Sequence, residues 1–181
     1  DGRLRPVRGV LPAVHAAATR GFERFVVPHA NLAEAELVPG VEVLGAVSLA
    51  EVARWHGAEI EVPDQDPVPG EARIVPSGDP PDLAEVVGQA GAVEALIAAA
   101  AGGHHLLMSG PPGAGKTMLA RRLPGILPAL DDEAALEVAS LRSLAGESVV
   151  MLDRTPPFEA PHHSASIAAL VGGGSRTAHP G

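Results

Sequence analysis

The eight residues GPPGAGKT, at positions 110–117, constrain the fold of this chain more than any other stretch. They match the spacing G-x-x-x-x-G-K-[ST] at every fixed position. Gly113 and Gly115 allow the backbone to turn with its N–H groups facing inward, and a following helix adds the positive end of its dipole. Lys116 adds a positive charge, and the Thr117 hydroxyl is an oxygen ligand that suits Mg²⁺. The stretch therefore predicts a P-loop that cradles nucleotide phosphates.

The flanking sequence predicts the surroundings that a P-loop needs. The apolar run HLLMSG, residues 105–110, predicts a buried strand, and KTMLARRL, residues 116–123, predicts a helix that turns Met118, Leu119 and Leu123 inward. A Gly/Pro-rich surface turn is the alternative interpretation, and the order strand, loop and helix favours the P-loop. Lys116 is the predicted catalytic residue and Thr117 the predicted Mg²⁺ ligand. The predicted ATP contacts in this stretch are Gly110, Pro111, Pro112, Gly113, Ala114, Gly115, Lys116, Thr117 and Met118.

Composition excludes several classes of protein. Apolar residues make up 46% of the chain but aromatic ones only 2%, so Ala, Val and Leu must supply the core. Without cysteine there are no disulfides or zinc–thiolate sites. We find no signal peptide and no run long enough to span a membrane, which favours a cytoplasmic protein without membrane partners. The formal charge of −9 argues against a broadly basic nucleic-acid surface but leaves room for local basic loops.

The chain is expected to fold as α/β in two parts with a linker between them. Residues 1–57 predict strands at 2–7, 22–28 and 41–47, alternating with helices at 11–21, 30–38 and 48–57, the last capped by Ser48. The Pro- and Asp-rich residues 58–81 predict a flexible linker. Residues 82–181 predict a P-loop domain with an Ala-rich helix closed by Gly102 and Gly103, and a helix over 132–146. Because the chain starts at Asp1 and stops at AHPG, we expect it to be an internal piece of a longer protein.

Two long segments carry a family resemblance. DLAEVVGQAGAVEALIAAAAGG with the P-loop after it, and PFEAPHHSASIAALVGGG at 157–174, resemble the magnesium-chelatase-like AAA+ ATPases of the YifB/ComM family. Residues 1–52 resemble the C-terminal half of the Lon-protease-like (ribosomal S5 domain 2-like) α/β domain that precedes the ATPase in that family. The resemblance implies a partial Lon-like domain at 1–57 and a truncated AAA+ αβα domain at 82–181.

The resemblance also implies site residues outside the P-loop. It places Val87 and Gly88, within Val86–Gln89, against the adenine; a capped helix N-terminus is the alternative. It places His162 and His163 in a loop near the ring pore that contacts DNA or a neighbouring subunit. Hydrogen bonds that only hold the loop together are an equally open interpretation, and a metal pair is disfavoured because adjacent side chains point in different directions. Glycines 172–174 would form a hinge or tight turn.

The function that the resemblance implies is a ring-shaped motor, usually a hexamer, that uses ATP and Mg²⁺ for DNA branch migration or helicase action. In bacteria it serves recombination of incoming DNA during natural transformation, with DNA reached through pore loops. Two alternatives stay open. One is a chelatase-type ATPase that drives Mg²⁺ insertion into a porphyrin, and the other is a non-catalytic nucleotide switch.

Several catalytic parts of such proteins have no match in this chain. The lysine of Lon aligns with Leu11, which cannot accept a proton, so no peptidase dyad is expected and the Lon-like part is a scaffold or partner-binding surface. Asp153 follows an apolar run, but Arg154 stands where a Walker-B glutamate is usual, and a strand or hairpin end is the favoured interpretation. We expect the Walker-B, sensor and arginine-finger residues outside the chain, and Arg121 and Arg122 in solvent or ion pairs. The chain should bind ATP weakly without turning it over.

Overall fold

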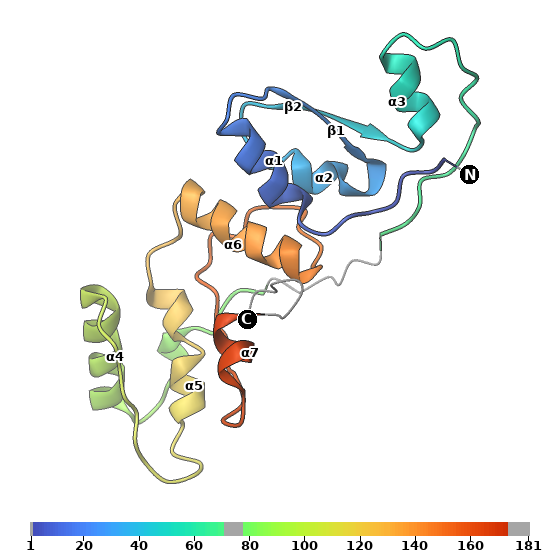
Figure 1. Cartoon of the computed structure of the whole chain (residues 1–181). Coiled ribbons are helices and arrows are strands. Elements are labelled where there is room, and N and C mark those ends of the chain that lie inside the picture. The colour runs from blue at the N-terminus through green and yellow to red at the C-terminus, as the bar shows by residue number, and fades with distance from the viewer. Residues whose placement is uncertain (1, 71–77, 174–181) are drawn as a thin grey trace. The chain divides into compact units, whose positions relative to one another are not determined.

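The computed structural model of the chain describes residues 2–70 and 78–173 (Figure 1). The chain divides into two compact units. Unit 1 comprises residues 1–75, 133–153 and 162–181, and unit 2 comprises residues 76–132 and 154–161. Among the described residues, no helix is long and apolar enough to cross a membrane.

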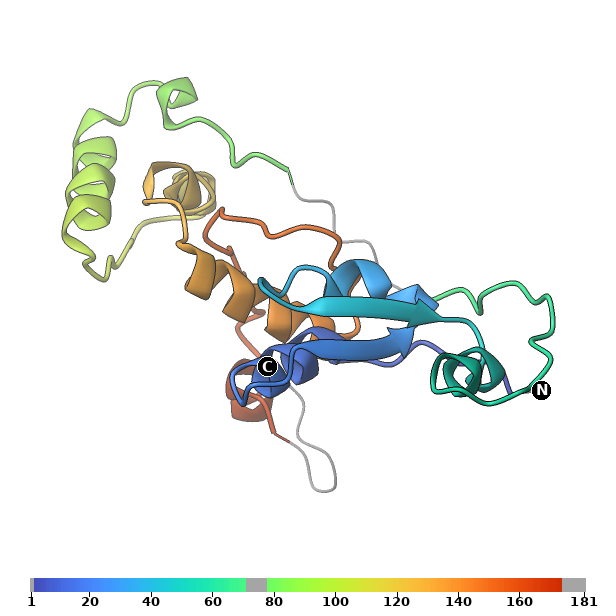
Figure 2. The ribbon, with the colours of Figure 1, turned by 90° about the horizontal axis from the view of Figure 1, so that it is seen from above.

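Unit 1 is a small α/β layer around two parallel strands. Strands β1 (Arg24–Pro28) and β2 (Glu42–Ala46) pair along their whole length, with Arg24 opposite Glu42 and Pro28 opposite Ala46. Figure 2 shows them side by side from above. The other elements of this unit are the helices α1 (Val10–Ala18), α2 (Leu32–Ala35), α3 (Leu49–Trp55), α7 (Ile167–Val171), α6 (Asp132–Ala145, all but its first residue) and the 3₁₀ turn η1 (His29–Asn31). The predicted elements between residues 11 and 57 are therefore confirmed, with somewhat shorter bounds.

One face of this sheet is packed and the other is open. Phe25, Val27 and Val43 point into a core that also contains residues of α1, α2 and α6. On the opposite face, Val26 and Leu44 lie in register and are both 41% exposed. Alternation along a strand places these two sets on opposite faces. Around Val26 and Leu44 the sheet is therefore buried on one side only, whereas Ala46 at its end is fully buried.

Helix ends in unit 1 follow their sequence signals. Ser48 caps α3, because its hydroxyl accepts a hydrogen bond of 3.3 Å from the Glu51 N–H. The Glu51 carboxylate in turn accepts one of 2.8 Å from the Val47 N–H. Gly57, just after α3, has a φ of 89°, a conformation that favours glycine. The predicted cap and stop of this helix are confirmed.

The strand predicted at residues 2–7 is wrong. This segment makes a single antiparallel bridge, between Arg3 and Ser48. Pro6 has no N–H to donate. Both backbone groups of Val7 are bonded to the Asn31 side chain, at 3.0 Å for the N–H and 2.8 Å for the carbonyl. A side chain therefore satisfies the backbone that a neighbouring strand would have paired.

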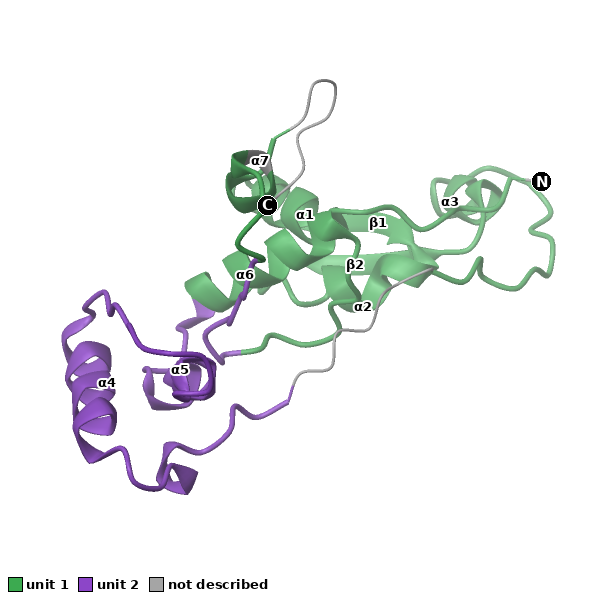
Figure 3. Cartoon of the chain, turned by 90° about the horizontal axis from the view of Figure 1, so that it is seen from below, with its two compact units in different colours: residues 1–75, 133–153, 162–181 green, residues 76–132, 154–161 purple. Residues whose placement is uncertain are grey.

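Unit 2 is helical in the part that the structure describes (Figure 3). Leu83, Leu96 and Leu119 form its buried centre, and Met118 and Leu123 pack against it, so the predicted inward face of the P-loop helix is confirmed. Gly103, with a φ of 62°, ends the Ala-rich helix as predicted. The elements are α4 (Ala90–Gly102), α5 (Lys116–Ala120) and the 3₁₀ turns η2 (Leu83–Glu85) and η3 (Leu123–Ile126).

The strand predicted directly before the P-loop is wrong for the described structure. Residues 105–110 have neither helix nor strand conformation, and Leu107 is 92% exposed. A strand needs a hydrogen-bonded neighbour, and both described strands belong to unit 1. The expected strand or hairpin over 148–154 is absent too, although Val149 is buried in the core of unit 1.

The two units do not follow the chain in the way that the predicted domains do. Unit 1 groups residues 133–153 with the N-terminal part, because Leu136 and Ala139 of α6 lie in its core. Residues 58–70 and 78–81 of the expected linker contain neither helix nor strand, and the rest of it lies outside the described residues. The boundaries at residues 57 and 81 stay a prediction.

Candidate nucleotide-binding site

The P-loop residues form an exposed turn that leads into α5. The Ala114 N–H donates to the Pro111 carbonyl across 3.3 Å, which closes the turn. Gly113 and Gly115 have φ values of 81° and 80°, in the left-handed region where a side chain is strained. Residues 110–114 are all exposed. The loop thus has the backbone shape that the two glycines predict and is open to a ligand.

Lys116, the first residue of α5, reaches back over this turn. Its Nζ donates to the carbonyl oxygens of Gly110 at 2.7 Å and Pro111 at 2.8 Å. A lysine ammonium has three donors, so one remains beyond these two bonds. The positive charge is thereby held at the loop, where phosphate oxygens would need it.

Thr117 follows at the surface of α5. An exposed hydroxyl at this position can supply one oxygen to a Mg²⁺ ion, whose other ligands in nucleotide sites are phosphate oxygens and waters. The described residues contain no group of three or more His, Asp or Glu side chains that could hold a metal ion by themselves. The exposed Thr117 hydroxyl is thus one candidate ligand for a Mg²⁺ ion that phosphate oxygens and waters would complete.

The segment Val86–Gln89, predicted to contact the adenine, lies beside the loop. Val86 packs in the core of unit 2, whereas Val87 is 89% exposed. Gly88 has a φ of 78°, which turns the chain before α4. The Gln89 side chain lies over Gly115, because a Cβ added there would be only 2.8 Å from Gln89 Nε2. The structure therefore brings the predicted base segment and the predicted phosphate loop together.

A residue pair that the sequence did not single out links η2, just before the base segment, to the end of the P-loop helix. Arg122, just after α5, forms an ion pair of 2.8 Å with Glu85 in η2. Arg122 was expected in solvent or an ion pair, which its contacts confirm, but Glu85 was missed. The two residues are 37 positions apart, so no local pattern could have paired them.

His162 and His163 belong to unit 1, in the loop that leads to α7. His162 Nδ1 lies 2.6 Å from the Ser164 hydroxyl, and the two imidazole centroids are 4.0 Å apart. Ser166 caps α7 through a bond of 3.2 Å from the Ala169 N–H. These bonds order the loop. Gly172, directly after α7, has a φ of 77° but lies in neither a turn nor a bend, and Gly174 lies outside the described residues, so the expected hinge or tight turn stays a prediction.

Two further candidates have structural roles in unit 1. Asp153 pairs with Arg142 of α6 at 3.6 Å, although no strand places it as a Walker-B residue would require. Leu11 is fully buried in the core of unit 1. Both positions therefore stabilise the unit through packing or charge pairing.

Unit 1 also contains a cavity of about 450 Å³. Arg5 and Arg8 lie on its wall with Asn31, Glu34 and Glu147. Glu34 already accepts hydrogen bonds from Asn31 Nδ2 at 2.6 Å and from Ser143 Oγ at 2.9 Å. No residue of the P-loop motif lines this cavity. The cavity therefore belongs to unit 1 alone. Part of its polar wall already forms hydrogen bonds within the protein.

A family match and several curated relatives cover different shares of the chain. Residues 82–181 match the family described as magnesium chelatase, subunit ChlI. Over its whole length the chain is 50% identical to an uncharacterised protein of Mycobacterium tuberculosis (strain H37Rv). It is 42% identical to competence protein ComM of Haemophilus influenzae and 40% identical to uncharacterised protein YifB of Escherichia coli K12, in each case over 96% of the chain.

The chain spans about a third of the length of these curated relatives. It covers 36% of the mycobacterial protein and 34% of each of the other two. The relatives match residues before position 82 as well as after it, since a match over 96% of the chain cannot fit within 82–181. Similarity to these bacterial proteins thus includes unit 1, beyond the residues of the family match.

Proposed function

Because the chain belongs to the magnesium chelatase ChlI family, and within it to the YifB/ComM proteins, we propose that it is the nucleotide-binding part of an ATP-driven DNA motor. The family matches support an ATPase-type module. The finer proposal is branch migration or helicase action during recombination in natural transformation. ATP and Mg²⁺ are the proposed cofactors.

The P-loop carries this proposal. Gly113 and Gly115 hold the left-handed turn, and Lys116 lies over it with one ammonium donor to spare. When bound, Mg²⁺ supplies charge neutralisation between the phosphates, and Thr117 is the residue that would hold it. The chain's own part is to bind and orient the phosphates.

A DNA motor is favoured over a porphyrin chelatase by the extent of the match. The family match starts at residue 82, but identity to competence protein ComM covers 96% of the chain. The N-terminal part, which we propose to be a partial Lon-like scaffold, is therefore shared with the YifB/ComM proteins. The proposed partners are identical subunits, which form a ring, and DNA. The loop at His162 and His163 is among the proposed DNA contacts, and the proposed location is the bacterial cytoplasm.

The test is ATP turnover by the full-length protein with branched DNA, linear duplex or no DNA. We expect branched DNA to stimulate turnover most, and the Lys116→Ala variant to abolish it. Turnover that is indifferent to DNA would reject the motor and shift weight to metal insertion, which a porphyrin assay tests, or to a nucleotide switch.

Alanine at both His162 and His163 should lower DNA stimulation but not basal turnover. Unchanged stimulation would restrict these residues to ordering their loop.

A further inference from the structure

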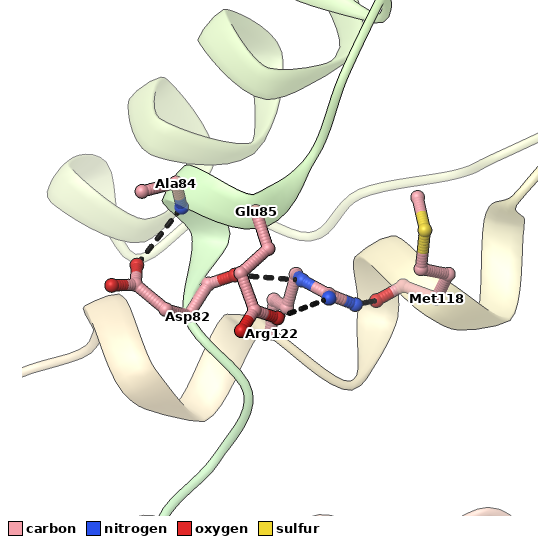
Figure 4. Close-up of polar contacts among 5 residues, drawn as sticks. All are labelled: Asp82, Ala84, Glu85, Met118 and Arg122. Atoms are coloured by element: carbon pink, nitrogen blue, oxygen red, sulfur yellow. Dashed lines mark hydrogen bonds and ion pairs between the residues drawn. The ribbon is translucent and has the colours of Figure 1, made fainter.

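Arg122 fastens the start of unit 2 to the end of the P-loop helix (Figure 4). Its guanidinium donates from Nε to the Asp82 carbonyl at 2.8 Å and from Nη2 to the Glu85 carboxylate at 2.8 Å. The remaining Nη1 donates to the Met118 carbonyl in α5 at 3.0 Å. Its side chain is only 12% exposed, whereas that of Glu85 is 64% exposed. The planar donor set of arginine thus bridges two segments that are far apart in sequence.

The other end of the same segment lies against the P-loop itself. The Gln89 side chain covers Gly115, with Nε2 at 2.8 Å from the position of an added Cβ. Between the two ends, Val86 enters the core of unit 2 beside Met118 and Leu119. Val87 is left pointing outward with 89% of its surface exposed. Residues 82–89 are thus bonded through Arg122 to the C-terminal end of α5 and lie against its N-terminal end, with the Val87 side chain exposed.

We propose that Arg122 is a positioning residue for the nucleotide base: by holding Asp82 and Glu85 it fixes the Val87–Gly88 segment at a set distance from the phosphate loop. This inference rests on the proposed nucleotide binding and extends it to a residue that touches no ligand. A base and a triphosphate are joined covalently, so their two binding segments must keep one spacing. Fixing that spacing before binding lowers the ordering cost of the complex.

The contacts separate this role from general support of the P-loop. The loop is closed by the bond from Ala114 to Pro111 and by the two bonds from Lys116, and none of these involves Arg122. Loss of Arg122 should therefore release the base segment and leave the phosphate cradle in place. A residue that only stabilised the fold would weaken every ligand equally.

The experiment compares Mg·ATP with inorganic tripolyphosphate, which has the phosphates and no base, in calorimetric titrations of the full chain. For Arg122→Gln, we expect ATP affinity to fall about tenfold while tripolyphosphate affinity stays within about twofold, since charge-assisted bonds of this kind are worth about that factor or more. Glu85→Gln should show the same selective loss to a smaller extent, and it decides the matter if Arg122→Gln does not fold. Arg121→Ala removes a positive charge from the neighbouring position and should change neither affinity.

Each other outcome overturns the inference in a recognisable way. Equal losses for the two ligands would make Arg122 a structural residue, and no loss for either would make its bonds irrelevant to binding. If the wild-type chain bound ATP no better than tripolyphosphate, the base segment would contribute nothing, and the P-loop proposal would stand. If the wild-type chain bound neither ligand, the proposed nucleotide binding would fall together with the inference.

Discussion

The ammonium nitrogen of Lys116 lies 2.7 Å from the carbonyl oxygen of Gly110, which ties the first residue of α5 to the first residue of the P-loop motif. A second bond, of 2.8 Å, reaches the Pro111 carbonyl. Both acceptors are backbone atoms, so the position of the ammonium group depends on the loop fold and on no other side chain. A phosphate that binds this lysine must use its third donor or replace one of these carbonyls.

Removing this ammonium group should weaken nucleotide binding selectively. We expect Lys116→Ala to lower Mg·ATP affinity at least about tenfold, because a hydrogen bond to a charged group contributes about 1.5–3 kcal/mol. The matched control is Arg121→Ala, which makes the same change in net charge at the exposed C-terminal end of α5 and should stay within about twofold. Calorimetric titration with ATP measures both. Equal losses would mean that net charge, rather than the position of Lys116, sets the affinity.

The chain itself is expected to bind ATP without repeated turnover. Hydrolysis requires a carboxylate to hold Mg²⁺ and another group to orient water. In the part that the structure describes, Asp153 is paired with Arg142 and unit 2 has no strand that would place a carboxylate beside the P-loop. Phosphate release from the purified chain at saturating Mg·ATP should therefore not exceed one equivalent. Multiple turnover that Lys116→Ala abolishes would contradict this.

Alanine substitutions at the two P-loop glycines should destabilise unit 2 to different extents. An alanine at Gly113 meets no neighbour within 4 Å, so Gly113→Ala should cost only the backbone strain of a positive φ, about 1–2 kcal/mol. An alanine at Gly115 carries the same strain and also requires the flexible end of the Gln89 side chain to shift, so it should destabilise unit 2 slightly more. Hydrogen exchange of the α4 and α5 amides measures this local stability.

The control for this pair is Gly91, inside α4, where φ is not positive and an added Cβ meets nothing within 4 Å. Gly91→Ala should stabilise the helix by about 0.5–1 kcal/mol. Identical protection losses for Gly113→Ala and Gly115→Ala would show that Gln89 moves freely, and would weaken the case for a base segment that lies against the P-loop.

Local signals in the sequence predicted many features of this molecule correctly. Pairing between segments that are distant in sequence could not be predicted from such signals. Ser48 and Gly57 bound α3 as predicted because a cap acts within a few residues. The spacing of GPPGAGKT likewise predicted the left-handed turns at Gly113 and Gly115. Each of these features depends only on residues within a few positions in the sequence.

The wrong predictions share a different cause. Residues 2–7 have a strand-like pattern, but the side chain of Asn31 takes the backbone bonds of Val7. Residues 105–110 are apolar enough for a strand, yet a strand also needs a neighbour, and the apolar pattern carries no information about one. Glu85 was missed for the same reason, because its partner Arg122 is distant in sequence. At these positions the conformation or the partner depends on residues that are distant in sequence.

The bonds between Asn31 and Val7 yield the last prediction, which concerns unit 1. Asn31 is 8% exposed, accepts from the Val7 N–H, and donates from Nδ2 to both the Val7 carbonyl and the Glu34 carboxylate. Asn31→Asp removes the donor and places a second carboxylate beside Glu34. We expect a loss of about 2 kcal/mol in the free energy of unfolding, since both hydrogen bonds from Nδ2 are lost and two like charges meet. Trp55, the single tryptophan of the sequence, reports the transition in urea by its fluorescence.

Two companion variants divide this loss into its parts. Asn31→Ala adds no charge, but it also removes the bond from the Val7 N–H that the aspartate of Asn31→Asp keeps. The difference in unfolding free energy between the two variants therefore compares repulsion from Glu34 with the loss of that third bond. Adding Glu34→Gln to Asn31→Asp removes the repulsion and provides an amide donor, which should restore part of the stability, although the Val7 carbonyl stays unpaired. If Asn31→Asp were as stable as the wild type, the bonds at 2.8 Å and 2.6 Å would be dispensable, and another contact would have to hold residues 2–7 against η1.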